Sequence, residues 1–187
     1  MSVFFIFSFL FCVGCSVGWL IELIFRRFIS RNNAERLWIN PGYLRGPWLP
    51  LYGFGLTVMF FTSELLPSYL GISRFSALLT VLLMAACMTA LEYLAGIIST
   101  RLLGVRLWDY SKEWGNLDGL ICPKFSLIWA ILCLLYYYFL HPLVLSVTHF
   151  AKSSHILILG VVIYLAFFLA DLASTLKNHQ DRHSARR

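Results

Sequence analysis

Five long apolar runs constrain this chain more than any other feature of its sequence. A helix needs about 20 mostly apolar residues to cross a bilayer, and runs of that length lie at roughly 3–25, 48–66, 75–98, 121–145 and 155–174. The runs are continuous and do not alternate with polar residues, which is typical of helices and not of barrel strands. We therefore predict an all-α polytopic membrane bundle of about five transmembrane helices.

The composition excludes most other classes of protein. Of the 187 residues, 59% are hydrophobic and 13% are charged, about half the charged share of a soluble domain, which is roughly 25%. This balance excludes a disordered chain and an ordinary soluble domain. The net charge of +6 is spread between and after the apolar runs, so we predict no nucleic-acid partner and expect the lipid bilayer to surround the chain.

The basic residues are distributed unevenly between the connections. Of the 15 Lys and Arg residues, 13 lie in the first connection, in the third connection with its flank, and in the tail, while only 2 lie in the other connections. Cytoplasmic loops are enriched in Lys and Arg, so we expect the N-terminus outside and the C-terminus in the cytoplasm. The expected organisation is one integral-membrane domain over 1–175 and a basic cytoplasmic tail over 176–187.

Motifs for nucleotide, metal and covalent chemistry are missing from the sequence. There is no P-loop, and no signature of a zinc protease, a serine hydrolase or a dinucleotide-binding fold. Five cysteines are present, and Cys12 and Cys15 are spaced as C-x-x-C, but no second pair completes a zinc site. We therefore predict no cofactor and no metal, and any activity that needs energy requires a partner.

Polar residues concentrate in the two basic connections. The stretch 40–55 contains three prolines and four glycines with Arg45 as its only charge, and the stretch 107–123 combines Trp and Tyr with acids. An intramembrane charge costs about 3 kcal/mol, so Glu22 and Glu92, in the first and third runs, should face a partner or a wet cavity. The predicted orientation places both acids at the depth of these loops. The predicted substrate-binding or gating site consists of Glu22, Arg45, Tyr52, Glu92, Trp108, Asp109, Tyr110 and Asn116.

The same residues also allow two other interpretations. A purely structural arrangement would pair Arg45 with Glu22 or Glu92 and tie a loop to a helix without any ligand. A parallel internal repeat would also place the acids at equivalent positions, because Glu22 precedes Gly46-x-x-x-Pro50 and Glu92 precedes Gly119-x-x-x-Pro123.

The two loop signatures resemble the motif blocks of one family. Glu22 followed by Gly42-Tyr43-Leu44-Arg45-Gly46-Pro47 and Pro50-Leu51-Tyr52-Gly53 is similar to the first block of the putative ABC-transporter type IV family, also called CmpB-like. Glu92 followed by Trp108-Asp109-Tyr110, Asn116-x-x-Gly119 and Trp129 is similar to the second block. The resemblance covers residues 15–145. It implies a small polytopic membrane protein that acts as an ABC permease component.

Three functions stay open at this point. The first is a permease component that works with a separate nucleotide-binding ATPase subunit or as a homo-oligomer. The second is an integral-membrane enzyme for lipid headgroups or lipid-linked substrates, with Glu92 or Asp109 as general base and Arg45 as phosphate clamp. The third is a membrane scaffold or assembly factor. The expected location is the bacterial inner membrane.

Overall fold

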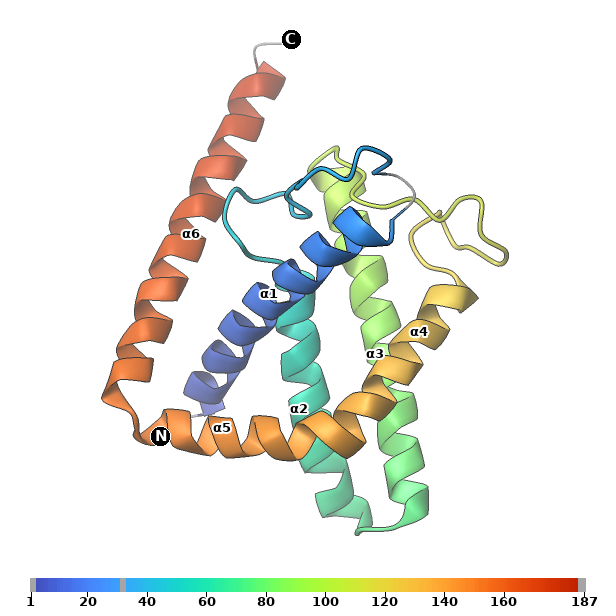
Figure 1. The fold of residues 1–187 in the computed structure, drawn as a ribbon, viewed down its shortest axis with the longest axis vertical. Coiled ribbons are helices and arrows are strands. Elements are labelled where there is room, and N and C mark those ends of the chain that lie inside the picture. The colour runs from blue at the N-terminus through green and yellow to red at the C-terminus, as the bar shows by residue number, and fades with distance from the viewer. Residues whose placement is uncertain (1–2, 31–32, 185–187) are drawn as a thin grey trace. The chain divides into compact units, whose positions relative to one another are not determined.

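The computed structural model describes residues 3–30 and 33–184. Within them the chain forms α1 (Val3–Phe28), α2 (Pro50–Leu70), α3 (Arg74–Ile97), α4 (Pro123–Leu135), α5 (His141–Ser153) and α6 (His155–Ser184) (Figure 1). Two π-helical turns, Ile98–Leu102 and Tyr136–Leu140, extend α3 and join α4 to α5. The described residues contain no strand, so the predicted all-α class is confirmed.

Four helical segments of the described chain are long and apolar enough to cross a membrane. They are Val3–Phe28, Arg74–Leu102, Pro123–Ser153 and His155–Asp181. Helix α2 forms where the second run predicts it, but it is not among these four. It carries Glu64 and an internal Pro67. All five predicted runs are therefore helical, and four of them, all but the second, lie in candidate membrane spans.

The third of these segments is bent. Helices α4 and α5 run in different directions on either side of the π-helical turn Tyr136–Leu140 (Figure 1). Pro142 follows two residues after that turn. π-Helical turns and prolines are the common causes of helix kinks, because both interrupt the regular backbone hydrogen bonds.

The chain divides into two compact units, Met1–Gly53 with Ala151–Arg187, and Phe54–Phe150. In the first unit α1 packs against α6. Phe11 and Cys15 of α1, Leu44 of the following loop and Phe168 of α6 form a buried cluster. A Cβ atom at Gly53 would lie 2.6 Å from the Sγ of Cys15, so a glycine is needed where the first turn of α2 meets α1.

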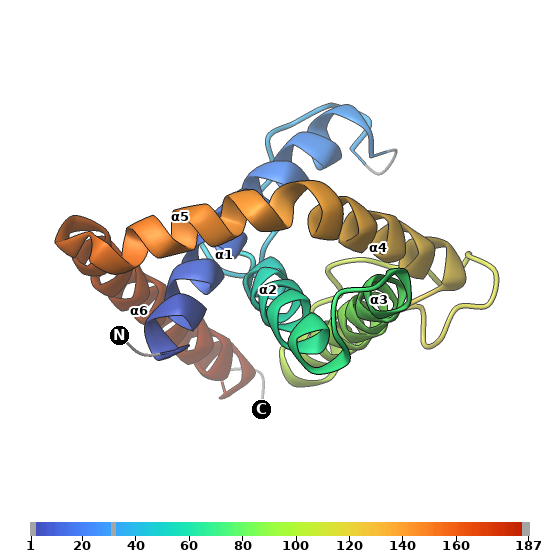
Figure 2. The same ribbon diagram turned by 90° about the horizontal axis from the view of Figure 1, so that it is seen from below.

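In the second unit α3 lies along α4 (Figures 1 and 2). Met84 and Met88 of α3 and Cys133 of α4 are almost completely buried. Helix α2 approaches α3 closely at Gly55, where an added Cβ atom would lie 2.7 Å from the Cε of Met88. Small residues at helix contacts allow this closeness in membrane bundles, where packing and not water exclusion holds helices together.

Three of the basic residues on which the predicted orientation rests, Arg31, Arg186 and Arg187, lie outside the described residues. Helix α6 continues past the apolar run to Ser184. Most of the predicted tail is therefore helical.

Candidate functional site

The connection between α3 and α4, residues 103–122, is folded by its own side chains. The Nδ2 of Asn116 donates to the carbonyl of Ser111 at 3.2 Å, and its Oδ1 accepts the N–H of Gly119 at 3.0 Å. The Oδ1 of Asp109 accepts the N–H of Ser111 at 2.9 Å. Asn and Asp side chains commonly build turns in this way. Asn116 and Asp109, both predicted site residues, therefore shape the loop.

Asp109 has a shifted acidity for a clear reason. The hydrogen bond from the Ser111 N–H, with Arg106 and Lys112 nearby, holds the pKa of the Asp109 carboxyl below its usual range. The Nη1 of Arg106 lies 3.5 Å from the Oδ1 of Asp109. The carboxylate form is thus the one that the folded loop favours.

Two aromatic residues of the same loop fix its position, Trp108 by a contact within the loop and Tyr110 by contacts with the helices. The Nε1 of Trp108 donates to the carbonyl of Leu120 at 2.8 Å. The ring of Tyr110 stacks on the ring of Phe125 in α4, with 4.1 Å between centroids and an interplanar angle of 11°. The hydroxyl of Tyr110 then reaches α3 and donates to the Oε1 of Glu92 at 3.1 Å.

Glu92 is the most enclosed acid of the described chain, with only 4% of its surface exposed. Its Oε1 accepts from Tyr110, and its Oε2 accepts the Nε1–H of Trp129 at 3.1 Å. No Lys, Arg or His among the described residues forms an ion pair with it. A carboxyl inside a membrane-spanning segment is thus held by two neutral donors, one from a loop and one from α4.

Glu22 lies in a different setting in the first unit. Its Oε1 lies 3.0 Å from the Nε of Arg26, one helical turn further along α1, and its Oε2 accepts the hydroxyl of Tyr52 at 3.2 Å. The side chain of Glu22 is 24% exposed. Tyr52 fits beside α1 because residue 18 is glycine, where any side chain would collide with the tyrosine.

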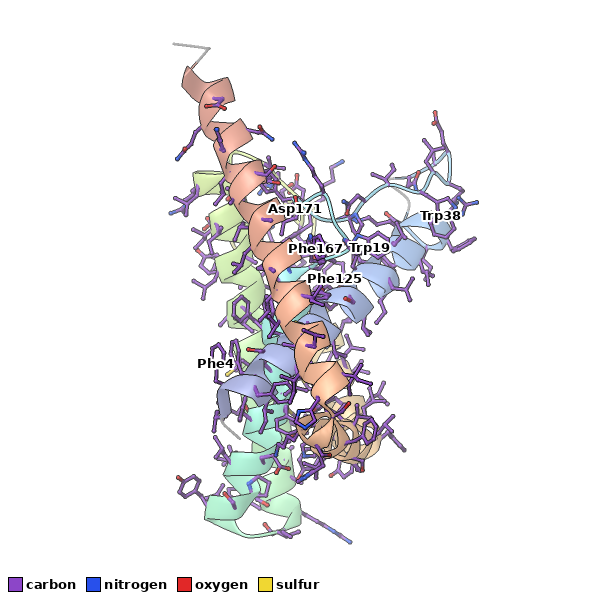
Figure 3. The ribbon with its side chains drawn as sticks, turned by 90° about the vertical axis from the view of Figure 1, so that its left-hand side faces the viewer. Phe4, Trp19, Trp38, Phe125, Phe167 and Asp171 are labelled. Carbon is purple, nitrogen blue, oxygen red and sulfur yellow. The ribbon has the colours of Figure 1, made fainter. Side chains whose placement is uncertain are left out.

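Asp171 of α6 holds the glycine- and proline-rich loop and is absent from the predicted site. Its Oδ2 accepts the N–H of Gly46 at 2.8 Å and the Nε1–H of Trp48 at 2.7 Å. The ring of Trp48 packs edge-on against Tyr164, with 5.1 Å between centroids. Figure 3 labels Asp171 on α6 beside this loop. The available signal was an acid at the end of an apolar run, which also marks a simple helix end.

Arg45 does not make the contact proposed for it with Glu22, because Glu22 pairs with Arg26. The side chain of Arg45 is exposed. Its carbonyl accepts the Nδ2 of Asn40 at 3.1 Å, and the Oδ1 of Asn40 accepts the Nε1–H of Trp19 at 3.0 Å. Arg45 is therefore a surface residue of a loop that Asn40 and Asp171 shape.

The structure brings the predicted residues together in two groups. Glu22 contacts Tyr52 in the first unit, and Glu92 contacts Tyr110 in the second. That both groups form one site stays a prediction. Trp129, which belongs to the second motif block but not to the predicted site, completes the contacts of Glu92.

Two further polar features lie in the second unit. A cavity of about 410 Å³ adjoins the loop, lined by Thr100, Arg101, Gly104, Arg106, Asp118 and Leu120. The Nε2 of His141 lies 2.9 Å from the Oε1 of Glu64, and its Nδ1 lies 3.2 Å from the hydroxyl of the buried Tyr136. Among the described residues, no group of three His, Cys, Asp or Glu side chains is placed to hold a metal ion.

Comparison with known proteins gives one match. The model of the family described as putative ABC-transporter type IV matches residues 9–176. This range contains both motif blocks and continues through the fifth apolar run, beyond the resemblance noted in the sequence. No curated protein and no solved structure matches the chain.

Proposed function

Because the chain belongs to the putative ABC-transporter type IV family, we propose that it is the permease component of a membrane transport assembly, with a polar gating site on the cytoplasmic side. The observation that carries this proposal is the environment of Glu92. A carboxyl buried in an apolar helix, with two neutral donors and no ion-pair partner among the described residues, is costly to desolvate, so an apolar residue packed at this position would serve the fold as well. Intramembrane acids of this kind commonly mark transport pathways.

The contacts of Glu92 also suggest how the gate is moved. A permease needs a cytoplasmic loop on which a nucleotide-binding subunit docks. The 103–122 loop suits this role, since it is folded by its own bonds and leaves the ring of Trp114 85% exposed. Tyr110, four residues earlier in the sequence, donates a hydrogen bond to Glu92. A partner that shifts this loop would therefore change the contacts of an acid inside the membrane segment.

The arrangement in the membrane follows from the same proposal. Helix α2 has 21 residues and a length of about 31 Å at 1.5 Å per residue, enough to cross a bilayer inside a bundle. With α2 as a fifth span, the basic connections lie in the cytoplasm, the N-terminus lies outside and the C-terminus lies inside. We place the protein in the bacterial inner membrane, as one membrane domain over 1–175 with a basic tail over 176–187.

Five helices are few for a complete transport path. The proposal therefore includes a separate nucleotide-binding ATPase subunit, together with self-association of the chain. The ATPase subunit would dock on the 103–122 loop, and a second copy of the chain would contact the exposed apolar faces of the helices.

The test is co-purification of an ATPase from native membranes with the tagged full-length chain. We expect the wild-type chain to recover a nucleotide-binding subunit and to stimulate its ATP hydrolysis. Glu92→Gln should retain the partner but lose most of the stimulation, because the amide offers one acceptor in place of two. Glu64→Gln is the matched control, with little expected change, since Glu64 lies outside the predicted site and its side chain is 42% exposed.

Three results would contradict the proposal. Recovery of no ATPase from membranes that contain the wild-type chain would remove the transport role. Lipid turnover that depends on Glu92 would favour the membrane enzyme. Recovery of a protein without nucleotide-binding activity, unaffected by Glu92→Gln, would favour a scaffold.

A further inference from the structure

The segment after α1 folds back onto the end of that helix. Asn33, which is 8% exposed, donates from Nδ2 to the carbonyl of Arg26 at 3.2 Å and to the carbonyl of Leu37 at 2.8 Å. Its Oδ1 accepts the N–H of Leu37 at 3.1 Å. One buried amide therefore fixes the position of residues 33–40 beside the end of α1.

Arg36 strengthens the same turn. Its φ angle is 55°, a left-handed conformation that is uncommon for a residue with a Cβ atom. Its Nη1 donates to the carbonyl of Arg27 at 3.0 Å and to that of Ser30 at 3.4 Å. Carbonyls at a helix C-terminus lack partners in the helix and attract positive charge. The guanidinium of Arg36 is thus used to cap α1.

Arg27 has a different environment. Its guanidinium carbon lies 4.2 Å from the centroid of the Trp38 ring and 5.5 Å from that of Phe28. Its Nε is buried and has no hydrogen-bond partner in the described part of the chain. The adjacent Arg26, in contrast, is paired with Glu22. Arg27 therefore presents a positive charge that two aromatic rings orient and that no described acid neutralises.

Five apolar side chains in the same turn as Arg27 are exposed to solvent. This exposed set lies at the end of a membrane-spanning helix, and Figure 3 labels Trp38 where the chain has left α1. Tryptophan and arginine together are typical of the level where lipid headgroups meet acyl chains. The exposed fractions are 60% for Phe28, 65% for Ile29, 51% for Leu37, 57% for Trp38 and 49% for Ile39.

We propose that this turn, residues 27–30 and 33–39, is a binding site for an anionic phospholipid. The guanidinium of Arg27 binds the phosphate, for which its planar donors are well shaped, and the apolar side chains enter the boundary between headgroups and acyl chains. Glu35 is the one acid of the turn. Its negative charge would repel a second anionic group in the headgroup, so the site favours a lipid whose negative charge is held at the phosphate next to Arg27. The site does not depend on the transport role proposed above.

The test uses the purified full-length chain in a neutral detergent, with thermal unfolding as the readout. Phosphatidylglycerol should raise the Tm of the wild-type chain by several degrees more than phosphatidylcholine does, since a ligand of the folded state stabilises it. Arg27→Gln should lose at least half of this difference, and Trp38→Ala should lose a smaller part. Arg74→Gln, at the start of α3, is the matched control and should keep the full difference.

Several results would overturn the site. One is an Arg27→Gln chain with the full preference for phosphatidylglycerol. Another is inorganic phosphate that raises the Tm as much as the lipid does, because the ligand would then be a free anion. If Arg27→Gln does not fold, native mass spectrometry of Arg27→Lys gives the answer. Lysine keeps the charge but not the planar donors, so fewer bound phosphatidylglycerol molecules are expected, and an unchanged number would exclude the guanidinium as the binding group.

Discussion

The two halves of the chain build the same local pattern around an acid. In each half, a helix that carries a glutamate leads into a glycine-containing loop, and the next helix begins at a proline, Pro50 or Pro123. In each half, a tyrosine hydroxyl donates to the glutamate. The distances are 3.2 Å from Tyr52 to Glu22 and 3.1 Å from Tyr110 to Glu92.

The electrostatic settings of the two acids are nevertheless different. Glu22 has Arg26 one turn away and is partly exposed, whereas Glu92 is buried between two neutral donors. The negative charge of a paired and partly exposed acid stays compensated even when the neighbouring loop moves. A buried acid depends on each donor that reaches it. The same sequence pattern therefore contains an ion-paired acid in one half and, in the other half, a buried acid whose contacts depend on the position of a loop.

The largest expected difference concerns removal of the two carboxyl groups. Glu92→Ala leaves a buried indole N–H and a tyrosine hydroxyl without acceptors, so we expect a loss of about 2–4 kcal/mol in the free energy of unfolding. Glu22→Ala should lose less than about 1 kcal/mol, because water reaches that site. Equilibrium unfolding in detergent measures both. Equal losses in the free energy of unfolding would mean that the burial of Glu92 does not make its contacts more important for stability than those of Glu22.

A smaller difference is expected for the two hydroxyl groups. Tyr110→Phe takes one of two donors from a buried carboxyl and should lose about 1.5–3 kcal/mol, whereas Tyr52→Phe should lose about 0.5–1 kcal/mol. Faster proteolysis of the 103–122 loop should accompany only the Tyr110 change, since Tyr110 joins that loop to α3, whereas Tyr52 donates to Glu22 of α1. If the loop keeps its wild-type cleavage rate in Tyr110→Phe, the hydrogen bond between Tyr110 and Glu92 does not hold the loop in place.

The response to salt sharpens the comparison further. A double-mutant cycle of Glu22→Gln and Arg26→Gln should give a coupling of about 0.3–0.5 kcal/mol at low salt, as for other i,i+4 pairs, and less at 1 M salt. The coupling between Glu92 and Tyr110, from Glu92→Gln and Tyr110→Phe, should change little with salt, because that contact is buried. A salt-sensitive coupling at Glu92 would indicate a charged partner there.

The smallest effect is the pH dependence of the 103–122 loop. Asp109 has a pKa below its usual range, chiefly because of the Ser111 N–H. A carboxyl with a lowered pKa in the folded state stabilises that state above its unfolded pKa, and the contribution disappears as the pH falls through the lowered value. We expect the loop to be cleaved faster by pepsin as the pH falls through the acidic range. Asp109→Asn, compared with the wild-type chain at each acidic pH, should remove this increase in cleavage, because the amide does not titrate.

The helices follow closely from the sequence, because length and apolarity are local properties. The run at 75–98 corresponds to Arg74–Ile97, and the prolines at 50 and 123 start helices, as expected of a residue without an N–H. The pair of Glu22 with Arg26 is also readable from its i,i+4 spacing. The predicted pairing of Arg45 with the acids rests on depth in the membrane, which gives no information about neighbours on the same helix.

The contacts that shape the loops were harder to predict. Apolar runs give the depth of a residue but not the direction in which its side chain points around the helix. Asp171 is 125 residues from Gly46 and Trp129 is 37 residues from Glu92, so neither contact has a local signal. The π-helical turn at Tyr136–Leu140 contains no proline, glycine or charged residue that would indicate an interruption of the helix.

The bend between α4 and α5 has a consequence for how this part of the chain fits a membrane. A straight helix over the 31 residues of Pro123–Ser153 would be about 46 Å long, well beyond a hydrocarbon thickness of about 30 Å. Such an excess leads to hydrophobic mismatch, which an unbroken helix relieves by tilting or by thickening the bilayer. The turn at Tyr136–Leu140 lets the excess length change direction, so the apolar segment fits without deforming the lipid around it.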